Sequence, residues 1–184
     1  MNKKLYDDSW MYILLLTTLI ILAESIKGYS FSIMNYKITY SILLLPLTFL
    51  VANFITKKYD YKKTLSAIGI SIIGVFCFIF IMCFAIGKEF LIYDISGDIL
   101  GYGVSQIINL IFCSFLIHNT KPNIVLIFST YLISLIVFYM VYTLVYLNTL
   151  VLDNYWIKYI LTMGIQGIIC IPLSIIDRYI KIGR

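Results

Sequence analysis

The chain has 184 residues, of which 61% are hydrophobic and only 12% are charged. A soluble globular domain is about 45–50% apolar and about 25% charged, so this composition excludes one. At about 1.5 Å per helical residue, a bilayer core of about 30 Å needs roughly 20 apolar residues per span, which leaves room for six or seven spans at most. We therefore expect an all-α polytopic membrane protein, with one transmembrane domain over residues 1–184.

Six apolar runs, separated by polar or charged residues, are candidate transmembrane segments. Each should be helical, because lipid offers no partner for an unpaired backbone group. The period-2 alternation that is typical of a membrane β-barrel is absent. The expected helices cover residues 10–26, 38–55, 65–86, 99–117, 123–147 and 156–176.

Lysine and arginine predict which way these helices point, because cytoplasmic loops of membrane proteins are enriched in both. One side of the expected topology has ten of these residues: Lys3, Lys4, Lys57, Lys58, Lys62, Lys63, Lys121, Arg178, Lys181 and Arg184. The other side has four: Lys27, Lys37, Lys88 and Lys158. Both termini should therefore be cytoplasmic, in a bacterial cytoplasmic membrane. We interpret the four lysines of residues 57–63 as a topology signal rather than a ligand site.

The fourth expected helix has the densest set of intramembrane polar groups. Its polar residues recur at the i, i+3 and i+4 spacing of one helix face: Tyr102, Ser105, Gln106 and Asn109. Gly97, Gly101 and Gly103 would let a neighbouring helix or a flat ligand approach the backbone closely. Two interpretations remain open at this point, a hydrogen-bonded seam between helices and a ligand site.

The second and sixth expected helices add further polar groups. Pro46 should kink the second helix, since it removes a backbone donor, and Asn53 lies nearly on the same face seven residues later. The sixth helix has Thr162 and Gln166 at i, i+4. Together with Gln106 and Asn109, these amides form an uncharged set of donors and acceptors. Such a set suits a neutral, planar, heteroatom-rich ligand and suits a metal ion or an anion poorly.

The remaining polar residues give little support to catalysis. Glu24 is expected to face water at the end of the first helix, and Asp98 to cap the start of the fourth. The one histidine, His118, is expected at the surface, and no motif joins a nucleophile to a base. The four cysteines lie in apolar runs without a CxxC pair. We expect no enzyme activity, no cofactor and no metal site.

Two motifs resemble those of the queuosine precursor transporters, which are also called the putative vitamin uptake family. Residues 46–53, followed by Tyr59, resemble that family's P-x-x-[FY]-L-x-x-D-x-x-x-E-x-Y-G signature. Residues 101–109 resemble its A-Y-x-x-[SG]-Q-x-x-D stretch, and residues 156–172 are similar to its last span. The six spans, short loops and cytoplasmic termini agree, so the resemblance covers nearly the whole chain.

The chain departs from the family pattern at its acidic positions. Asn53 and Asn109 replace two acids, Lys57 replaces a glutamate and Asp60 a glycine. The family's N-x-x-D motif of the fifth span is absent around residues 134–137. An amide still forms hydrogen bonds, but it loses their charge-assisted strength and cannot titrate. The departures leave three outcomes open: another ligand, another driving force, or loss of transport.

The resemblance implies import of a 7-deazapurine such as 7-cyano-7-deazaguanine or queuine. The ligand would lie between the second, fourth and sixth helices, near the midplane of the bilayer. Gln106 and Asn109 would bind its edge, with Asn53 and Gln166 assisting, Tyr102 stacking or donating, and Ser105 on the same face.

The expected partners are this small neutral purine-like substrate and the lipid bilayer. A homodimer is left open, and nucleic acid is excluded because the basic residues are dispersed between apolar runs. Two alternatives remain. One is a substrate-binding subunit of an energy-coupling-factor vitamin importer, which also has six spans. The other is a non-transporting membrane scaffold.

Overall fold

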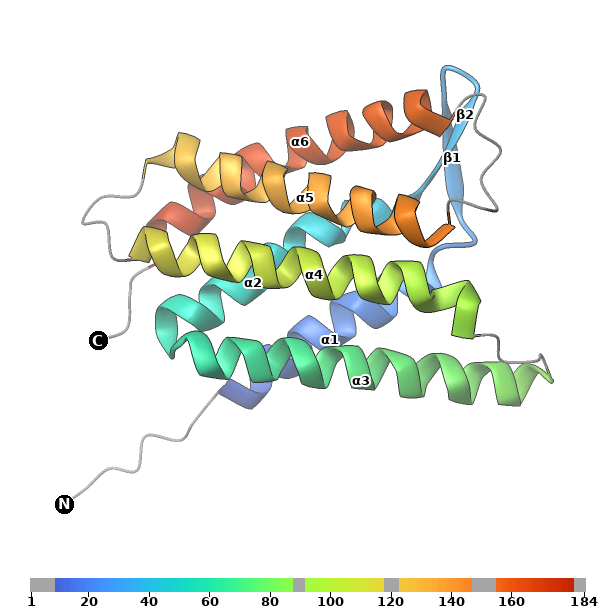
Figure 1. Cartoon of the computed structure of the whole chain (residues 1–184), viewed down its shortest axis with the longest axis horizontal. Coiled ribbons are helices and arrows are strands. Elements are labelled where there is room, and N and C mark those ends of the chain that lie inside the picture. Colours follow the sequence, from blue (N-terminus) through green and yellow to red (C-terminus); the bar gives the residue numbers. More distant parts are fainter. Residues whose placement is uncertain (1–8, 88–91, 118–122, 147–154, 181–184) are drawn as a thin grey trace.

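The computed structural model describes residues 9–87, 92–117, 123–146 and 155–180. In these ranges the chain forms a bundle of six α-helices that alternate in direction along one long axis, with a small β-hairpin at one end (Figure 1). The helices are α1 (Ser9–Ser25), α2 (Leu45–Lys58), α3 (Tyr61–Ile86), α4 (Ile92–Ile117), α5 (Ile124–Tyr146) and α6 (Tyr155–Tyr179). The hairpin consists of β1 (Ser30–Ile33) and β2 (Tyr36–Thr39), and the 3-10 helix η1 (Tyr40–Leu43) follows it.

Five helical segments are long and apolar enough to cross a bilayer: Tyr40–Lys58, Tyr61–Ile86, Ser96–Ile117, Ile124–Val145 and Ile157–Tyr179. The sixth helix, α1, is equally apolar but has 17 residues. The outward faces are covered by large apolar side chains, such as Phe84, which is 84% exposed, and Leu144, which is 70% exposed. Water would not tolerate such a surface and lipid would. The expectation of a helical, multi-pass membrane protein is therefore confirmed.

The second expected helix is wrong in its first half. Residues 38–39 belong to β2, and α2 begins only at Leu45. Pro46 consequently lies in the first turn of α2, where a missing backbone donor has no effect, and does not kink the helix. The hairpin in front of it turns through Met34 and Asn35, both with positive φ, as a two-residue hairpin loop requires. The apolar run alone could not separate a buried strand from a helix.

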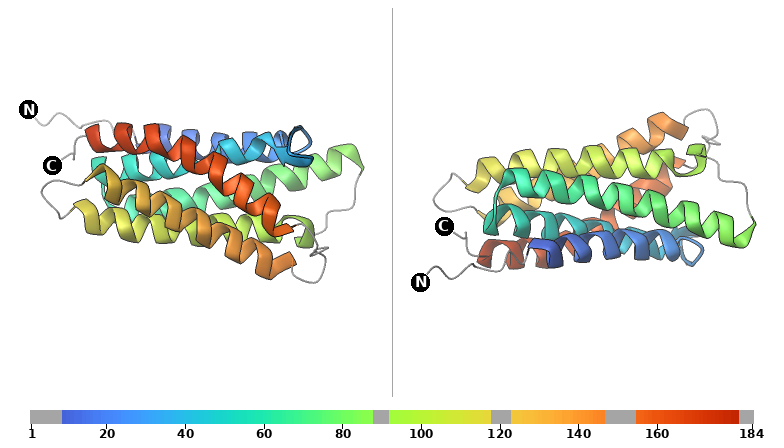
Figure 2. Two further views of the ribbon diagram at one scale, coloured as in Figure 1. Left: turned by 90° about the horizontal axis from the view of Figure 1, so that it is seen from above. Right: turned by 90° about the horizontal axis from the view of Figure 1, so that it is seen from below.

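Helix α2 lies at the centre of the bundle and contacts all five other helices. Seen from above and below, the other helices run lengthwise around it, with α6 crossing the bundle obliquely (Figure 2). One apolar cluster packs α1, α3 and α4 around Ile55, and a second packs α5 and α6 around Phe49. Because α2 is buried on nearly every side, the polar residues of α2 face other helices and not lipid.

The helices α4 and α5 approach each other closely at a glycine. A Cβ atom added to Gly101 would lie 3.1 Å from the ring and 3.1 Å from the backbone oxygen of Phe138. The expectation that the glycines of this helix permit close packing is thus confirmed at Gly101. The contact fixes the position of Phe138, which lines the cavity described next.

Candidate functional site

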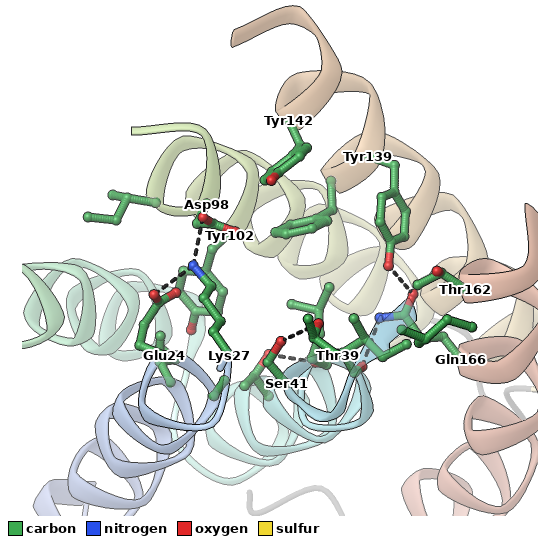
Figure 3. Close-up of a pocket in the computed structure, with 18 of the residues that line it drawn as sticks. Glu24, Lys27, Thr39, Ser41, Asp98, Tyr102, Tyr139, Tyr142, Thr162 and Gln166 are labelled. Carbon is green, nitrogen blue, oxygen red and sulfur yellow. Dashed lines mark hydrogen bonds and ion pairs between the residues drawn. The ribbon is translucent and has the colours of Figure 1, made fainter. Parts of the chain in front are cut away.

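A cavity of about 400 Å³ lies at the hairpin end of the bundle. The helices α1 to α6, β2 and η1 all contribute residues to its wall (Figure 3). Its inner wall is mainly apolar, with Ile38, Ile42 and Val75 among the contributing residues. A cavity of this size and composition is typical of a site for a small organic molecule.

Aromatic rings from α4, α5 and α6 form one side of the cavity. They are Tyr102, Phe138, Tyr139, Tyr142 and Tyr159. Phe138 and Tyr142 are stacked with their centroids 6.2 Å apart, and Tyr139 lies 4.9 Å from Tyr159. Rings held in this way offer flat faces to a planar ligand at a low cost in conformational entropy.

Gln166 also lines the cavity, and hydrogen bonds hold its amide in place. Tyr139 Oη donates to Gln166 Oε1 at 2.9 Å, and Gln166 Nε2 donates to the carbonyl of Ile42 at 2.8 Å (Figure 3). The amide therefore joins α5 and α6 to η1. Its Oε1 can accept one more hydrogen bond, and its Nε2 can donate one more.

Two buried polar atoms at or beside the cavity have no hydrogen-bond partner. The Tyr102 hydroxyl is unpaired, although the side chain is only 5% exposed and lines the cavity. Gln106 is fully buried, and its Nε2 donates at 2.7 Å to the hydroxyl of Thr48, another residue of the cavity wall. The Oε1 atom of Gln106 is left without a partner. Because a buried unpaired group costs about 1–3 kcal/mol, such atoms indicate where a ligand could supply the missing bonds.

Charged residues lie at the edge of the cavity. Lys27 Nζ contacts Glu24 Oε2 at 2.6 Å and Asp98 Oδ2 at 2.7 Å, which ties the end of α1 to α4 (Figure 3). Burial by itself would lower the pKa of Lys27, but the carboxylates of Asp98 and Glu24 together raise it above its ordinary value.

Two expectations about these acids are wrong. Glu24 does not simply face water, because it is paired with Lys27. Asp98 does not cap α4, because the helix begins six residues earlier, at Ile92. The apolar residues of α4 begin only where the helix would enter the bilayer core. The sequence pattern therefore predicted the start of α4 too late.

A second polar cluster lies at the other end of the bundle. Lys57 Nζ contacts Asp177 Oδ1 at 2.6 Å, and both residues are buried, with exposed fractions of 7% and 1%. The other carboxylate oxygen accepts from Asn53 Nδ2 at 2.9 Å and from the Tyr131 hydroxyl at 3.1 Å. Asn109 Nδ2 donates to Asn53 Oδ1 at 2.8 Å, so helices α2, α4, α5 and α6 all meet at this cluster.

The expectation that Lys57 lies in a loop is wrong, whereas its part in the topology signal stays a prediction. The helix α2 continues to Lys58, and its last turn is buried against α6. The spacing of Asn53 and Lys57 at i, i+4 was the available signal, since it places both on one helix face. Asp177 and Tyr131 carried no signal that linked them to Lys57, because they come from distant parts of the chain.

The structure divides the predicted site residues between the two ends. Tyr102 and Gln166 line the cavity. Gln106 lies behind the cavity wall and contacts it through Thr48. Ser105 donates to the carbonyl of Tyr102 in its own helix. The other two, Asn53 and Asn109, lie in the cluster around Asp177.

The remaining expectations concern His118 and the cysteines. His118 lies outside the described residues. The cysteines are free thiols, and in the described part of the chain no group of three histidine, cysteine or acidic side chains could hold a metal ion.

No family model, curated protein or solved structure matches this chain. The fold and the cavity define the chain as a multi-pass helical membrane protein with a ligand-sized cavity at one end of its bundle. The resemblance to the queuosine precursor transporters stays a prediction, and the functional argument depends on the residues of the chain itself.

Proposed function

We propose that this chain is a six-span transporter of the bacterial cytoplasmic membrane that imports a 7-deazapurine precursor of queuosine, such as 7-cyano-7-deazaguanine. The observation that carries the proposal is the cavity with aromatic walls, with the unpaired Tyr102 Oη in its wall and the unpaired Gln106 Oε1 behind that wall. A planar base has aromatic faces for the tyrosines and edge donors and acceptors for these atoms. Its binding would remove the cost of leaving them unpaired.

The direction of import follows from the position of the cavity. It lies at the hairpin end, where α1 ends and α6 begins, and this is the side with only four lysines. By the distribution of basic residues this side is outside the cell, and both termini lie inside. The sixth span would be α1, whose 17 residues reach about 25 Å, near the lower limit for crossing a bilayer.

The cavity also favours transport over the scaffold alternative. A scaffold needs its polar groups satisfied by neighbouring helices and has no use for a ligand-sized cavity. Here the hydroxyl of Tyr102 is unsatisfied at a cavity of about 400 Å³. The energy-coupling-factor alternative shares the cavity and differs only in needing an ATPase partner, so co-purification of an ATPase would favour it.

A rescue assay tests the proposal. Bacteria that lack both deazapurine synthesis and their own transporter would express the chain and receive limiting 7-cyano-7-deazaguanine. Queuosine in their tRNA would be detected by the shift in a boronate gel. A shifted band is expected, and its absence with the protein present in the membrane would exclude this substrate.

Two matched variants make the assay specific for the site. Gln106→Leu keeps the volume of the side chain and removes its amide, so uptake should be lost while insertion is unchanged. Thr130→Val is the control, because Thr130 is also buried but donates only to the backbone of its own helix. Uptake by Q106L at the level of T130V would remove Gln106 from the site.

A further inference from the structure

The Lys57–Asp177 pair closes the bundle at the end opposite the cavity. The two charged groups join α2 to α6, and both helices also contribute residues to the cavity wall, Thr48 and Gln166. Along α2, Lys57 lies nine residues beyond Thr48, or about 14 Å at 1.5 Å per residue. Each of these two helices therefore reaches from the cavity wall to the charged pair.

Polar groups continue through the bundle from the cavity to this pair. Gln106 Nε2 bonds to Thr48 on the cavity wall, and Asn109 follows one turn later on the same face of α4. Asn109 bonds to Asn53, which in turn bonds to Asp177. Gln106 Oε1 and Asn109 Oδ1 are both buried without a partner. The interior between the two ends is thus polar and incompletely bonded, unlike the apolar clusters beside it.

The charged pair itself is fully bonded in the conformation observed. Lys57 Nζ contacts one carboxylate oxygen of Asp177 and also donates to the backbone carbonyl of Asp177. Asn53 and Tyr131 donate to the second oxygen. Charged residues inside a membrane bundle are rare and mark the paths of substrates or ions, because each is costly to bury unless it is paired. Separation of the pair is tolerable only if water reaches both charges, which means that the bundle has opened there.

We propose that Lys57 and Asp177 form the inner gate of the transport path, closed in this structure, and that opening separates the end of α2 from the end of α6. The inference rests on the proposed function for the role of the gate, and it does not depend on the identity of the substrate. Paired charges hold the inner end shut while the cavity at the hairpin end is available to a ligand. Loss of the pair should shift the bundle toward the inward-open arrangement.

Cys113 provides a reporter within the chain. It is 2% exposed and follows Asn109, a member of the cluster around Asp177, by one turn of α4. A chain that keeps only this cysteine, with Cys77, Cys83 and Cys170 replaced by alanine, would be treated with a membrane-impermeant maleimide in right-side-out and inside-out vesicles. The label needs no ligand, so its result is independent of the rescue assay.

The variant Asp177→Asn should raise the labelling rate of Cys113 by at least about tenfold from the inner face alone, as a tenfold larger open population would. Lys57→Gln should act in the same direction and serves as the second variant if D177N does not fold. The exchange of both residues, K57D with D177K, should return labelling toward the original rate. Ser174→Ala is the control with the ion pair and its partners intact, because Ser174 is buried on the same helix as Asp177 and donates to the carbonyl of Cys170 in that helix; it should label slowly.

Unchanged labelling in both single variants would overturn the proposal, and so would equal labelling from both faces, which indicates general loosening. Failure of the exchanged pair to restore protection would also count against a gate. If the labelling behaves as expected while the rescue assay fails, the gate stands and only the substrate is wrong.

Discussion

The two ends of the bundle use polar side chains in opposite ways. At the hairpin end the charges lie at the edge, where Lys27 pairs with Glu24 and Asp98, and the cavity behind them contains uncharged hydroxyl and amide groups. At the opposite end the charges of Lys57 and Asp177 are buried between α2 and α6, with both oxygens of the Asp177 carboxylate hydrogen-bonded. The contrast teaches that polarity inside a membrane bundle does not by itself mark a ligand site. An unpaired polar atom beside an open volume favours a ligand, whereas a fully bonded charge favours closure between helices.

The largest expected effect comes from removing one partner of the Lys57–Asp177 pair. Lys57→Ala leaves the buried carboxylate of Asp177 without its counter-charge, which should lower the free energy of unfolding by about 3–5 kcal/mol. Thermal unfolding of the purified protein in detergent would measure it. The double variant K57M/D177L is the control, because an apolar pair of similar size should recover most of the loss. Equal melting temperatures for K57A and the unmodified chain would show that the pair contributes nothing.

A smaller effect is expected from the helix contact that supports the cavity. Gly101→Leu would push the ring and backbone of Phe138 away from α4, which should cost about 1–3 kcal/mol and distort the aromatic wall. Gly164→Leu is the matched control, since a Cβ there meets nothing within 4 Å and the residue is exposed. Melting temperatures and ligand binding should both fall for G101L alone. A similar loss in G164L would point to a general intolerance of leucine.

The hydroxyl of Tyr102 separates binding from folding. Because it has no partner in the bundle, Tyr102→Phe should leave stability unchanged or slightly raised. Loss of its bond to a ligand should raise the dissociation constant for 7-cyano-7-deazaguanine by up to about tenfold. Calorimetry of the purified protein would measure this. Tyr139→Phe provides the contrast, since it breaks a bond to Gln166 and should reduce stability as well. A loss of stability in Y102F would imply a partner within the fold.

The smallest effect concerns Lys27 at the edge of the cavity. Its pKa is raised above 10.5, so at about pH 9 a smaller fraction of the Lys27 amine is neutral than it would be without the shift. Acetic anhydride reacts with the neutral amine, so it should modify Lys27 more slowly than the exposed Lys37. The variant Asp98→Asn should speed the reaction, as followed by peptide mass spectrometry. The charge of Lys27 contributes stability below the unfolded pKa, and that contribution is lost only as the pH rises through the higher folded pKa. Equal rates at Lys27 and Lys37 would contradict the pairing.

The fold was largely predictable, and its exceptions have local causes. The six helical segments follow from apolar runs of about 20 residues, because lipid permits no other spanning structure for such runs. The β-hairpin was missed, since Ile38, the one buried residue of the strand Tyr36–Thr39, is followed closely by the next apolar run. The early start of α4 was missed because a helix can extend beyond the apolar zone into the interface.

The candidate site was only partly predictable. The spacing of residues in α4 correctly placed Tyr102, Gln106 and Asn109 on one polar face. It did not show that Tyr102 would line a cavity while Asn109 would join a charged cluster. The role of Gln166 as a bonded wall residue depends on η1, an element that the sequence pattern did not predict.

Composition and the length of the apolar runs are enough to predict that this protein crosses a membrane as a helical bundle, because both are properties of single segments. The sequence also determined which faces of those helices are polar, since helical periodicity is local. The contact of Lys57 with Asp177, 120 residues away, and the lack of a partner for Tyr102 Oη beside the cavity follow from the tertiary structure alone. Pairing across the bundle depends on which helices become neighbours and at what depth, and no segment contains that information alone.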